Sequence, residues 1–325
     1  MKRRHVLLTI AGIGLALRVP ESGAQSGGKP TVIGLLDASD RDEYWVAFRG
    51  KFRELGYVED RNVTFEFRAA KGNLDLLAPF AQELTRLNVR LIVTSGTAAA
   101  LAARRATSKI PIVMATGTDQ VSVGLAASLA RPGGNVTGVA TMSSELMPKR
   151  LELLREVVPK MQRVALLWHA DNLAWMASVK ELEVVTEKLK IALRIFGVRS
   201  AEELADAFAG MTKERVEGLI VVQSPFASTH RKRIVELAIK HRLPSAYGAA
   251  SFVAAGGLFS YAPDYLEMFR YAAVYADKIL KGANPADLPI EQPSKLEIVV
   301  NLKTAQAIGI TVPRAILTRA DQVIQ

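Results

Sequence analysis

The chain of 325 residues contains no cysteine and only four histidines. The absence of cysteine excludes disulfides, thiolate catalysis and cysteine-ligated metals. Three of the histidines, His169, His230 and His241, lie in separate elements without the spacing of metal ligands, so no metal site is predicted. The sequence also lacks glycine-rich phosphate-binding motifs, GxSxG and HExxH. Composition and motifs therefore favour a binding protein without a cofactor over an enzyme.

The first 24 residues have the features of a secretory signal peptide. A basic segment, Lys2–His5, precedes the apolar run Val6–Leu17, and Ser22-Gly23-Ala24 is a small-x-small cleavage site. The apolar run is too short to span a bilayer. Arg3-Arg4 also fits a twin-arginine signal, so the general secretory and the twin-arginine routes both stay open. We therefore expect a mature protein in the periplasm.

Positive charge is in excess, but it forms no long block. The formal net charge of +10 falls by three without residues 1–24, and Arg231–Arg233 is the densest basic run of the mature chain. No nucleic-acid-binding motif accompanies these cations, so no nucleic acid is expected as a partner. The charge suits an exported protein near anionic lipid, or one that attracts an acidic ligand.

Strands and helices alternate regularly through the first half. Short β-branched runs, typical of buried parallel strands, are followed by amphipathic stretches with a helical period. Strands are predicted at Thr31–Asp37, Asn62–Phe67, from Leu91, Pro111–Ala115 and Val136–Val139. Helices are predicted at Glu43–Leu55, Leu74–Leu87, after Thr97, and at Val121–Leu129. This order is typical of a doubly wound parallel sheet.

A similar series follows at an offset of about 130 residues, which predicts two similar Rossmann-like lobes. Strands are predicted from 163, 193, 218, 244 and 258, and a long helix at Asp264–Lys281. The fold class is therefore α/β, with a hinge and a ligand cleft between the lobes. We assign residues 30–139 with about 262–285 to the first lobe, and 140–261 with about 290–325 to the second.

Small polar residues recur where the predicted strands end, and in an α/β sheet this edge binds ligands. The turn Ser95-Gly96-Thr97 joins a buried strand to a helix, whose first N–H groups favour an anion such as a carboxylate. An ordinary capped turn is the alternative for any single case. The candidate ligand-binding residues besides this turn are Ser39, Tyr44, Thr116, Asp119, Asn172, Ser224, Tyr247 and Asp264.

Three segments resemble a known family, the periplasmic substrate-binding proteins of ABC transporters with the type I fold. They are SLARPGGNVTGV at Ser128–Val139, GGLFSYAPDY at Gly256–Tyr265, and the long tail at Ala286–Pro313. Within that family the chain is most similar to the group with tryptophan- and tyrosine-type binding proteins. The resemblance extends over the mature chain, but these segments are largely hinge and scaffold.

The resemblance implies a receptor that closes on a small carboxylate-bearing solute, such as an amino acid or a related organic acid. In relatives that bind amino acids, the carboxylate meets the turn corresponding to Ser95-Gly96-Thr97. Asp119 and Asp264 are candidate partners for an α-amino group. The implied protein partners are an ABC permease and its ATPase in the inner membrane, and the receptor is expected to be a monomer.

Two other functions are compatible with the same sequence. A ligand-sensing subunit of a membrane kinase or chemoreceptor would have the same fold and the same export signal. An exported α/β enzyme is a third candidate, although no nucleophile and base occur together in a known motif. A cytosolic repressor is disfavoured because no DNA-binding helix-turn-helix fits before Thr31.

Overall fold

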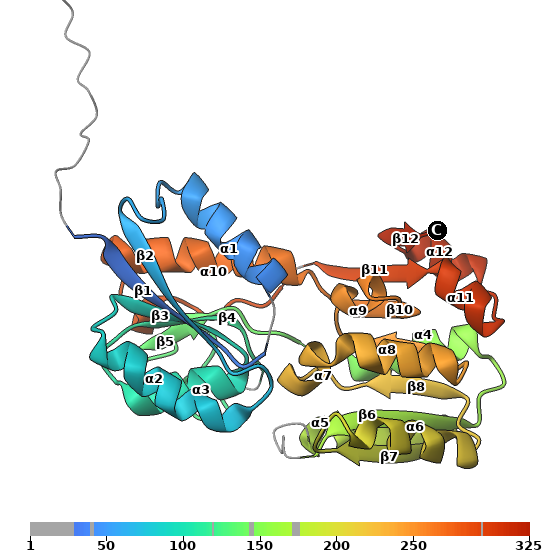
Figure 1. The fold of residues 1–325 in the computed structure, drawn as a ribbon. Coiled ribbons are helices and arrows are strands. Elements are labelled where there is room, and N and C mark those ends of the chain that lie inside the picture. The colour runs from blue at the N-terminus through green and yellow to red at the C-terminus, as the bar shows by residue number, and fades with distance from the viewer. Residues whose placement is uncertain (1–28, 40–41, 119, 143–145, 171–175, 294) are drawn as a thin grey trace, which may run out of the picture.

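The computed structural model describes residues 29–325, except 40–41, 119, 143–145, 171–175 and 294. Within these residues the strands form a five-stranded and a seven-stranded sheet. The two sheets lie side by side, each with helices on its faces (Figure 1). The fold is the predicted one, two α/β lobes, and we call the lobe with the five-stranded sheet the first lobe.

The first sheet is parallel throughout, with the strand order β2-β1-β3-β4-β5. Every residue of β3 and β4 is buried, as expected for central strands that are covered on both faces. The strands are β1 (Thr31–Asp37), β2 (Val63–Ala69), β3 (Leu91–Ser95), β4 (Ile112–Thr116) and β5 (Val136–Gly138).

Helices cover both faces of this sheet because neighbouring strand residues point to opposite sides. Val93 packs in one core with Phe48, whereas the adjacent Ile92 packs in another core with Ala100. The first face carries α1 (Asp42–Glu54) and α10 (Tyr265–Leu280), and the second carries α2 (Leu77–Arg86) and α3 (Thr97–Ala106). The helix α10 comes from the distant C-terminal part of the chain and packs along α1 (Figure 1).

The second sheet has the order β12-β11-β10-β9-β8-β6-β7. Its strands are parallel except that β10 pairs antiparallel with β11, which in turn runs parallel to β12. The strands are β6 (Arg163–His169), β7 (Ala192–Val198), β8 (Gly218–Val221), β9 (Ser245–Tyr247), β10 (Phe259–Pro263), β11 (Leu296–Asn301) and β12 (Gln322–Ile324).

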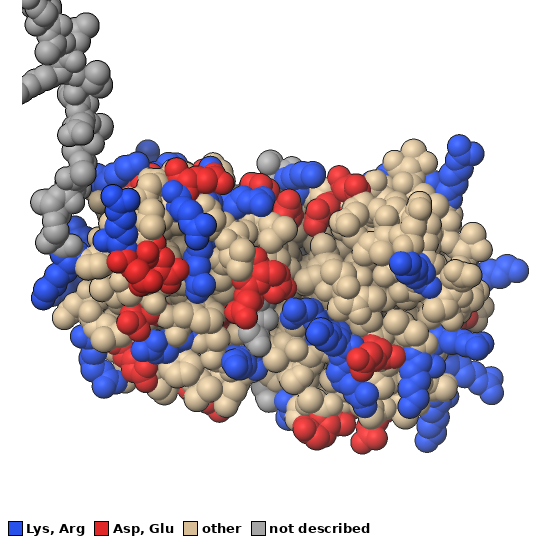
Figure 2. All heavy atoms as spheres, turned by 45° about the horizontal axis from the view of Figure 1, so that its top comes forward, with Lys and Arg blue, Asp and Glu red and all other residues tan. Residues whose placement is uncertain are grey.

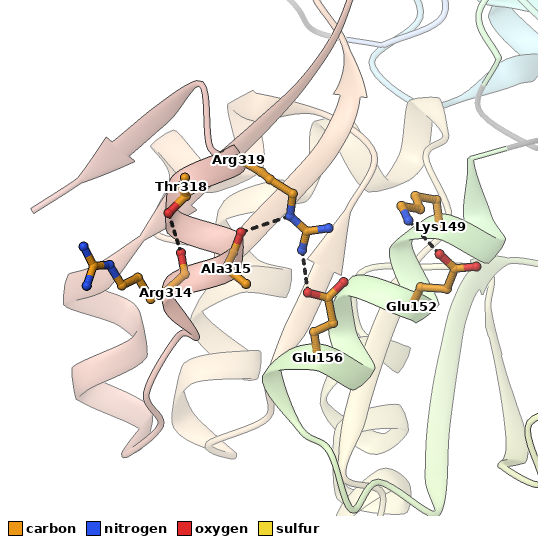
Figure 3. A network of polar contacts seen from close by, with 7 residues as sticks. All are labelled: Lys149, Glu152, Glu156, Arg314, Ala315, Thr318 and Arg319. Carbon is orange, nitrogen blue, oxygen red and sulfur yellow. Dashed lines mark hydrogen bonds and ion pairs between the residues drawn. The ribbon is translucent and has the colours of Figure 1, made fainter.

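Two sets of helices cover this second sheet. One core brings Leu166 together with residues of α4 (Met147–Val157), α5 (Met176–Lys188), α11 (Leu302–Ile308) and α12 (Arg314–Arg319). The adjacent Leu167 lies in the other core, with α6 (Glu203–Lys213), α8 (Arg231–Lys240) and α9 (Ala250–Ala254). The C-terminal helix α12 is held on α4 by the ion pair of Arg319 with Glu156 (Figure 3).

Three chain segments cross between the lobes: from β5 to α4, from β10 to α10, and from α10 back to β11. The first and third crossings pair through a bridge between Val139 and Glu291. The first crossing is also tied to the loop after β4, because the Thr141 hydroxyl donates to the Gly117 carbonyl at 3.0 Å. Several parallel crossings of this kind form a hinge.

The helix predicted at Val121–Leu129 is wrong. This segment consists of turns, and the Gln120 carbonyl accepts from the N–H groups of Leu125 and Ala126 in place of an i→i+4 ladder. Gly124 adopts φ +74°, which ends any right-handed helix there. The structure also contains elements that the sequence analysis did not predict, namely α7 (Pro225–Thr229), α9, α12 and β12.

Candidate functional site

The carboxyl ends of three neighbouring strands of the first lobe form one row. In the strand register Asp37 at the end of β1 is opposite Ser95 of β3, and Ser95 is opposite Thr116 of β4. The loops that follow these strands therefore lie side by side at the edge of the sheet. The topology brings Ser39, the Ser95 turn and Thr116 to the same edge of the sheet.

The Ser95 turn contains a buried hydroxyl without a hydrogen-bond partner and the start of a helix without a side-chain cap. Ser95 is fully buried, and its Oγ has no hydrogen-bond partner in the described part of the chain. Gly96 takes φ +94°, a conformation that favours glycine, and is the N-cap of α3 without a side-chain cap. The first N–H groups of an uncapped helix carry positive potential, so this turn can bind an anion.

The hydroxyls of Thr97 and Thr116 brace this turn. The backbone N–H of Gly96 donates to Thr116 Oγ1 at 3.0 Å. Thr97 Oγ1 accepts from the N–H of Thr118 at 2.9 Å and donates to the Thr118 carbonyl at 3.2 Å. These bonds join the loops after β3 and β4 into one rigid unit. Both threonines therefore position the turn.

Ser39 is part of a closed network around Asp37. Both residues are fully buried. Asp37 Oδ1 accepts from the backbone N–H of Ser39 at 2.9 Å and from its hydroxyl at 3.1 Å. Asp37 Oδ2 accepts from Trp45 Nε1 at 2.7 Å. This network fixes the start of α1 against the end of β1, and both carboxylate oxygens of Asp37 are engaged in it.

Tyr44 and Asp264 line a different cavity from the one expected. The Tyr44 ring is buried and stacks on Tyr265 with ring centroids 5.6 Å apart. Asp264 caps α10, since its Oδ1 accepts from the N–H of Glu267 at 3.1 Å. Both residues line a cavity of about 560 Å³ between the lobes, whose lining on the second lobe includes Glu297. Ser95 is not among the residues of that cavity.

In the second lobe Ser224 lies at a strand end, whereas Tyr247 lies in the core. Ser224 is the N-cap of α7, and its Oγ accepts from the N–H of Ala227 at 3.1 Å. Tyr247 is fully buried against Phe252, and its hydroxyl oxygen accepts from Ser245 Oγ at 2.8 Å. Ser245 is at the other end of β9, so the Tyr247 ring runs back along the strand. Asp119 and Asn172 lie outside the described residues.

Two glutamines that were not predicted as site residues resemble Ser95, because each is buried and has a side-chain atom without a hydrogen-bond partner. Gln120 follows β4 and Gln223 follows β8, and both are buried. Gln120 Nε2 and Gln223 Oε1 have no hydrogen-bond partner among the described residues. Buried amide atoms without partners are costly, so both residues are candidates for contact with a ligand. The rule applied to the strand ends also covers these two residues, but their burial is visible only in the fold.

Arg150 is a third residue that the sequence analysis missed. It is fully buried in the first turn of α4, and its Nε donates to the Tyr261 carbonyl at 2.9 Å. Burial lowers its pKa to about 10, against an opposing effect of Tyr265 and Tyr261. A Cβ on Gly248 would lie 3.3 Å from Arg150 Nη2, so the guanidinium lies beside the end of β9. The sequence of a helix that contains one arginine does not indicate that the guanidinium is buried beside the end of a strand.

An aromatic stack borders the same edge of the second lobe. The ring of His169, the last residue of β6, lies parallel to Phe226 of α7 with centroids 4.7 Å apart. Phe226 in turn contacts His230 at 4.6 Å between centroids. Burial lowers the pKa of His230, and nearby His169 adds to this effect, whereas Glu202 opposes it. The neutral form of His230 is therefore favoured.

The lobes touch each other across the seam between them. A Cβ on Gly72, in the loop after β2, would lie 3.5 Å from Thr229 Oγ1 of α7. Glu43 of α1 forms an ion pair with Arg231 of α8, with 3.5 Å between Oε1 and Nη2. Figure 2 shows acidic and basic side chains meeting along this seam. These contacts join the two lobes outside the crossing segments.

Over the described ranges, no group of three or more His, Asp or Glu side chains is placed to hold a metal ion. In the same part of the chain, no helix is long and apolar enough to cross a membrane.

Two α/β lobes joined by three crossing segments are the architecture of two-lobed solute-binding proteins. The chain belongs to the ABC transporter substrate binding protein family, whose sequence model matches residues 31–324.

The chain is similar to a known relative and to solved structures. A tyrosine-binding protein of Clostridioides difficile (strain R20291) is 24% identical over 274 residues, which are 84% of this chain and 79% of the relative. An ABC domain from Streptococcus pneumoniae, solved in complex with L-Trp, is 28% identical, with a TM-score of 0.83. That alignment covers 91% of this chain and 100% of the other. A conserved domain protein from Vibrio cholerae has a TM-score of 0.84 at 23% identity, with 91% and 100% covered.

Proposed function

We propose that this protein is the extracytoplasmic receptor of an ABC importer. It captures an amino acid, or a related carboxylate-bearing solute, between its two lobes, and hinge closure encloses the solute. The family assignment supports the transport role, and the site chemistry supports a carboxylate. Receptors in this class bind and release solute without a reaction.

The Ser95 turn is the observation that carries the carboxylate assignment. It combines an uncapped helix start, the buried and unpaired Ser95 Oγ, and the amide of Gln120 close by. A Cβ on Gly117 would lie 3.2 Å from Gln120 Nε2 and 3.6 Å from Thr97 Oγ1, which places that amide over the start of α3. Peptide N–H groups, a hydroxyl and an amide N–H are together suitable donors for a carboxylate.

Two relatives make an amino acid the preferred solute class. One is a tyrosine-binding protein, and the other was solved with L-Trp. Both of these solutes are aromatic amino acids, so L-tryptophan and L-tyrosine are the first compounds to test on this chain.

The remaining parts of the proposal follow from the transport role. The solute is delivered to an ABC permease and its ATPase in the inner membrane, and the receptor acts as a monomer in the periplasm. Residues 1–24 are its export signal. The first lobe consists of residues 30–139 with about 262–285, and the second of 140–261 with about 290–325.

Thermal denaturation of the purified protein in the presence of single solutes tests this proposal. The panel contains the common amino acids, aromatic acids without an amino group, and sugars. A ligand at 100 times its Kd stabilises the native state by about 2.7 kcal/mol, which raises the melting temperature by several degrees. We expect such a rise for one or a few amino acids. A panel without any stabilising solute contradicts the proposal.

The substitution Ser95→Asp tests the site itself. It puts a negative charge where the carboxylate is expected, and we expect affinity to fall at least tenfold, about 1.4 kcal/mol. Isothermal titration calorimetry with the stabilising solute measures the change. Ser108→Asp, on an exposed residue of the same lobe, is the matched control and should bind like wild type. Equal affinities of the two variants would remove the Ser95 turn from the site.

A further inference from the structure

Gln223 occupies a central place at the edge of the second lobe. It follows β8, which lies between β9 and β6 in the sheet. A Cβ on Gly248, just after β9, would lie 2.8 Å from Gln223 Cβ, so only glycine leaves room for this side chain. Gln223 therefore lies across the ends of two neighbouring strands, on the edge of the lobe where α7 meets the first lobe.

The amide of Gln223 is held in one orientation. Its Nε2 donates to Ser228 Oγ of α7 at 2.9 Å, and Ser228 is itself buried. Gln223 Oε1 is inaccessible to water and accepts no hydrogen bond from the residues that the structure describes. A buried amide oxygen fixed in this way is an acceptor that lacks its donor.

Other acceptors near the strand ends are already engaged. Asp37 accepts three hydrogen bonds, from Ser39 and Trp45. Asp264 caps α10 and lines the separate cavity beside Tyr44. The unpaired groups of the first lobe, Ser95 Oγ and Gln120 Nε2, suit a carboxylate, whereas the unpaired oxygen of Gln223 suits a donor. The unpaired atoms of the two lobes are thus chemically complementary to the two charged groups of a zwitterion.

We propose that Gln223 Oε1 accepts a hydrogen bond from the α-ammonium group of the solute, so that Gln223 determines the preference for amino acids over the corresponding acids. This inference rests on the proposed function, in which the carboxylate of the same solute binds the Ser95 turn. Closure of the lobes brings the two halves of the site onto one molecule.

Matched pairs of solutes with and without the amino group test the role of Gln223. L-tryptophan is compared with indole-3-propionic acid, and L-tyrosine with 3-(4-hydroxyphenyl)propionic acid, by isothermal titration calorimetry on the full-length protein. We expect wild type to prefer the amino acid of the better-bound pair at least tenfold. In Gln223→Met, which keeps the side-chain length but removes the acceptor, this preference falls to less than threefold. Gln306→Met, on an exposed face of α11, keeps the wild-type preference.

A second variant separates this role from a loss of folding. Gln223→Glu retains an acceptor of the same shape and is expected to restore the preference for the amino acid to tenfold or more. A preference that is unchanged in Gln223→Met overturns the inference while amino-acid binding by wild type still stands. A preference lost equally in Gln223→Glu and Gln223→Met overturns it too. If wild type binds none of the four compounds but binds another amino acid of the thermal panel, that amino acid and its analogue without the amino group form the matched pair; if wild type binds no amino acid, the inference falls together with the proposed function.

Discussion

At the scale of single residues, the features that point to ligand binding are buried polar atoms without hydrogen-bond partners. Ser95, Gln120 and Gln223 are buried, yet each keeps an atom without a partner among the described residues. Folded proteins satisfy most buried polar atoms, because a buried group without a hydrogen bond costs about 1 to 3 kcal/mol. Such atoms at facing strand ends are best explained by a solute that completes their hydrogen bonds.

The surroundings of Glu297 change the pKa of its carboxyl group. It lies on β11 beside the cavity between the lobes. Burial raises its pKa to about 7, and Asp264 and Asp321 add to this rise, whereas Lys295 opposes it. The pKa in the folded state is thus above that in the unfolded chain. The folded state binds this proton more tightly, so stability falls as pH rises from about 4.5 to about 7.

Glu297→Gln should remove this part of the pH dependence. The side chain is partly exposed, so the effect is small, and we expect the variant to melt roughly a degree or two above wild type at pH 8. At pH 4, below the pKa of Glu297 in both the folded and the unfolded state, the two melting temperatures should nearly coincide. Thermal denaturation in a series of buffers measures both. Glu59→Gln, on an exposed glutamate, is the control. A difference between Glu297→Gln and wild type that is the same at both pH values would contradict the argument.

At the scale of elements, the hinge depends on a close approach between β4 and β5. Gly138 ends β5 with φ +128°, and a Cβ there would lie 2.2 Å from the Met114 carbonyl oxygen and 2.5 Å from its nitrogen. The β4 backbone cannot move away from position 138, because the Val139 N–H donates to the Met114 carbonyl at 2.8 Å. The first crossing segment begins at this point. Only glycine permits the crossing to leave the sheet in this direction.

Gly138→Ala is therefore expected to lower the free energy of unfolding by about 2 kcal/mol or more, from backbone strain and steric overlap. The melting temperature should fall by roughly 5 °C or more. Circular dichroism during heating or urea titration measures this loss. Gly134→Ala is the matched control, since a Cβ at Gly134 meets nothing within 4 Å, and it should melt within about a degree of wild type. A stable Gly138→Ala variant would mean that the crossing can shift.

At the scale of the whole molecule, contacts outside the hinge also join the two lobes. Gly72 approaches α7, and Glu43 pairs with Arg231 at 3.5 Å. The side chains of this pair are 39% and 22% exposed, so solvent screens their attraction, and such pairs are worth about 0.2 to 1 kcal/mol. Because the closed state is only weakly favoured by such contacts, bound solute can control the population of closed molecules.

Reversing one charge of this pair should open the protein. Arg231→Glu replaces attraction by repulsion, and we expect a larger mean distance between the lobes and an affinity for solute about three to ten times weaker. The double variant Glu43→Arg, Arg231→Glu restores the pair and should behave like wild type. Cysteines introduced at the exposed positions Arg104 and Lys240 permit selective labelling for distance measurement, since the native chain has none. The difference should disappear in about 1 M salt. A double variant as open as the single one would exclude the pair from closure.

The sequence by itself determined the alternation of strands and helices, the number of lobes and the residues at the strand ends. These features depend on local periodicity, β-branched runs and small polar residues, all of which are visible along the chain. Gly124 was the local signal that the helical interpretation of Val121–Leu129 overlooked, since its positive φ interrupts the helix.

Only the tertiary structure decided which strands are neighbours and which buried atoms have no partner. The order β2-β1-β3-β4-β5 puts Asp37, Ser95 and Thr116 in one row, and the distant helix α10 covers the first sheet. Whether Gln223 and Tyr247 face a solute or the core depends on groups far away in the sequence, such as Ser228, Gly248 and Phe252. Hydrogen-bond satisfaction is a property of packing in three dimensions, which the order of residues does not contain.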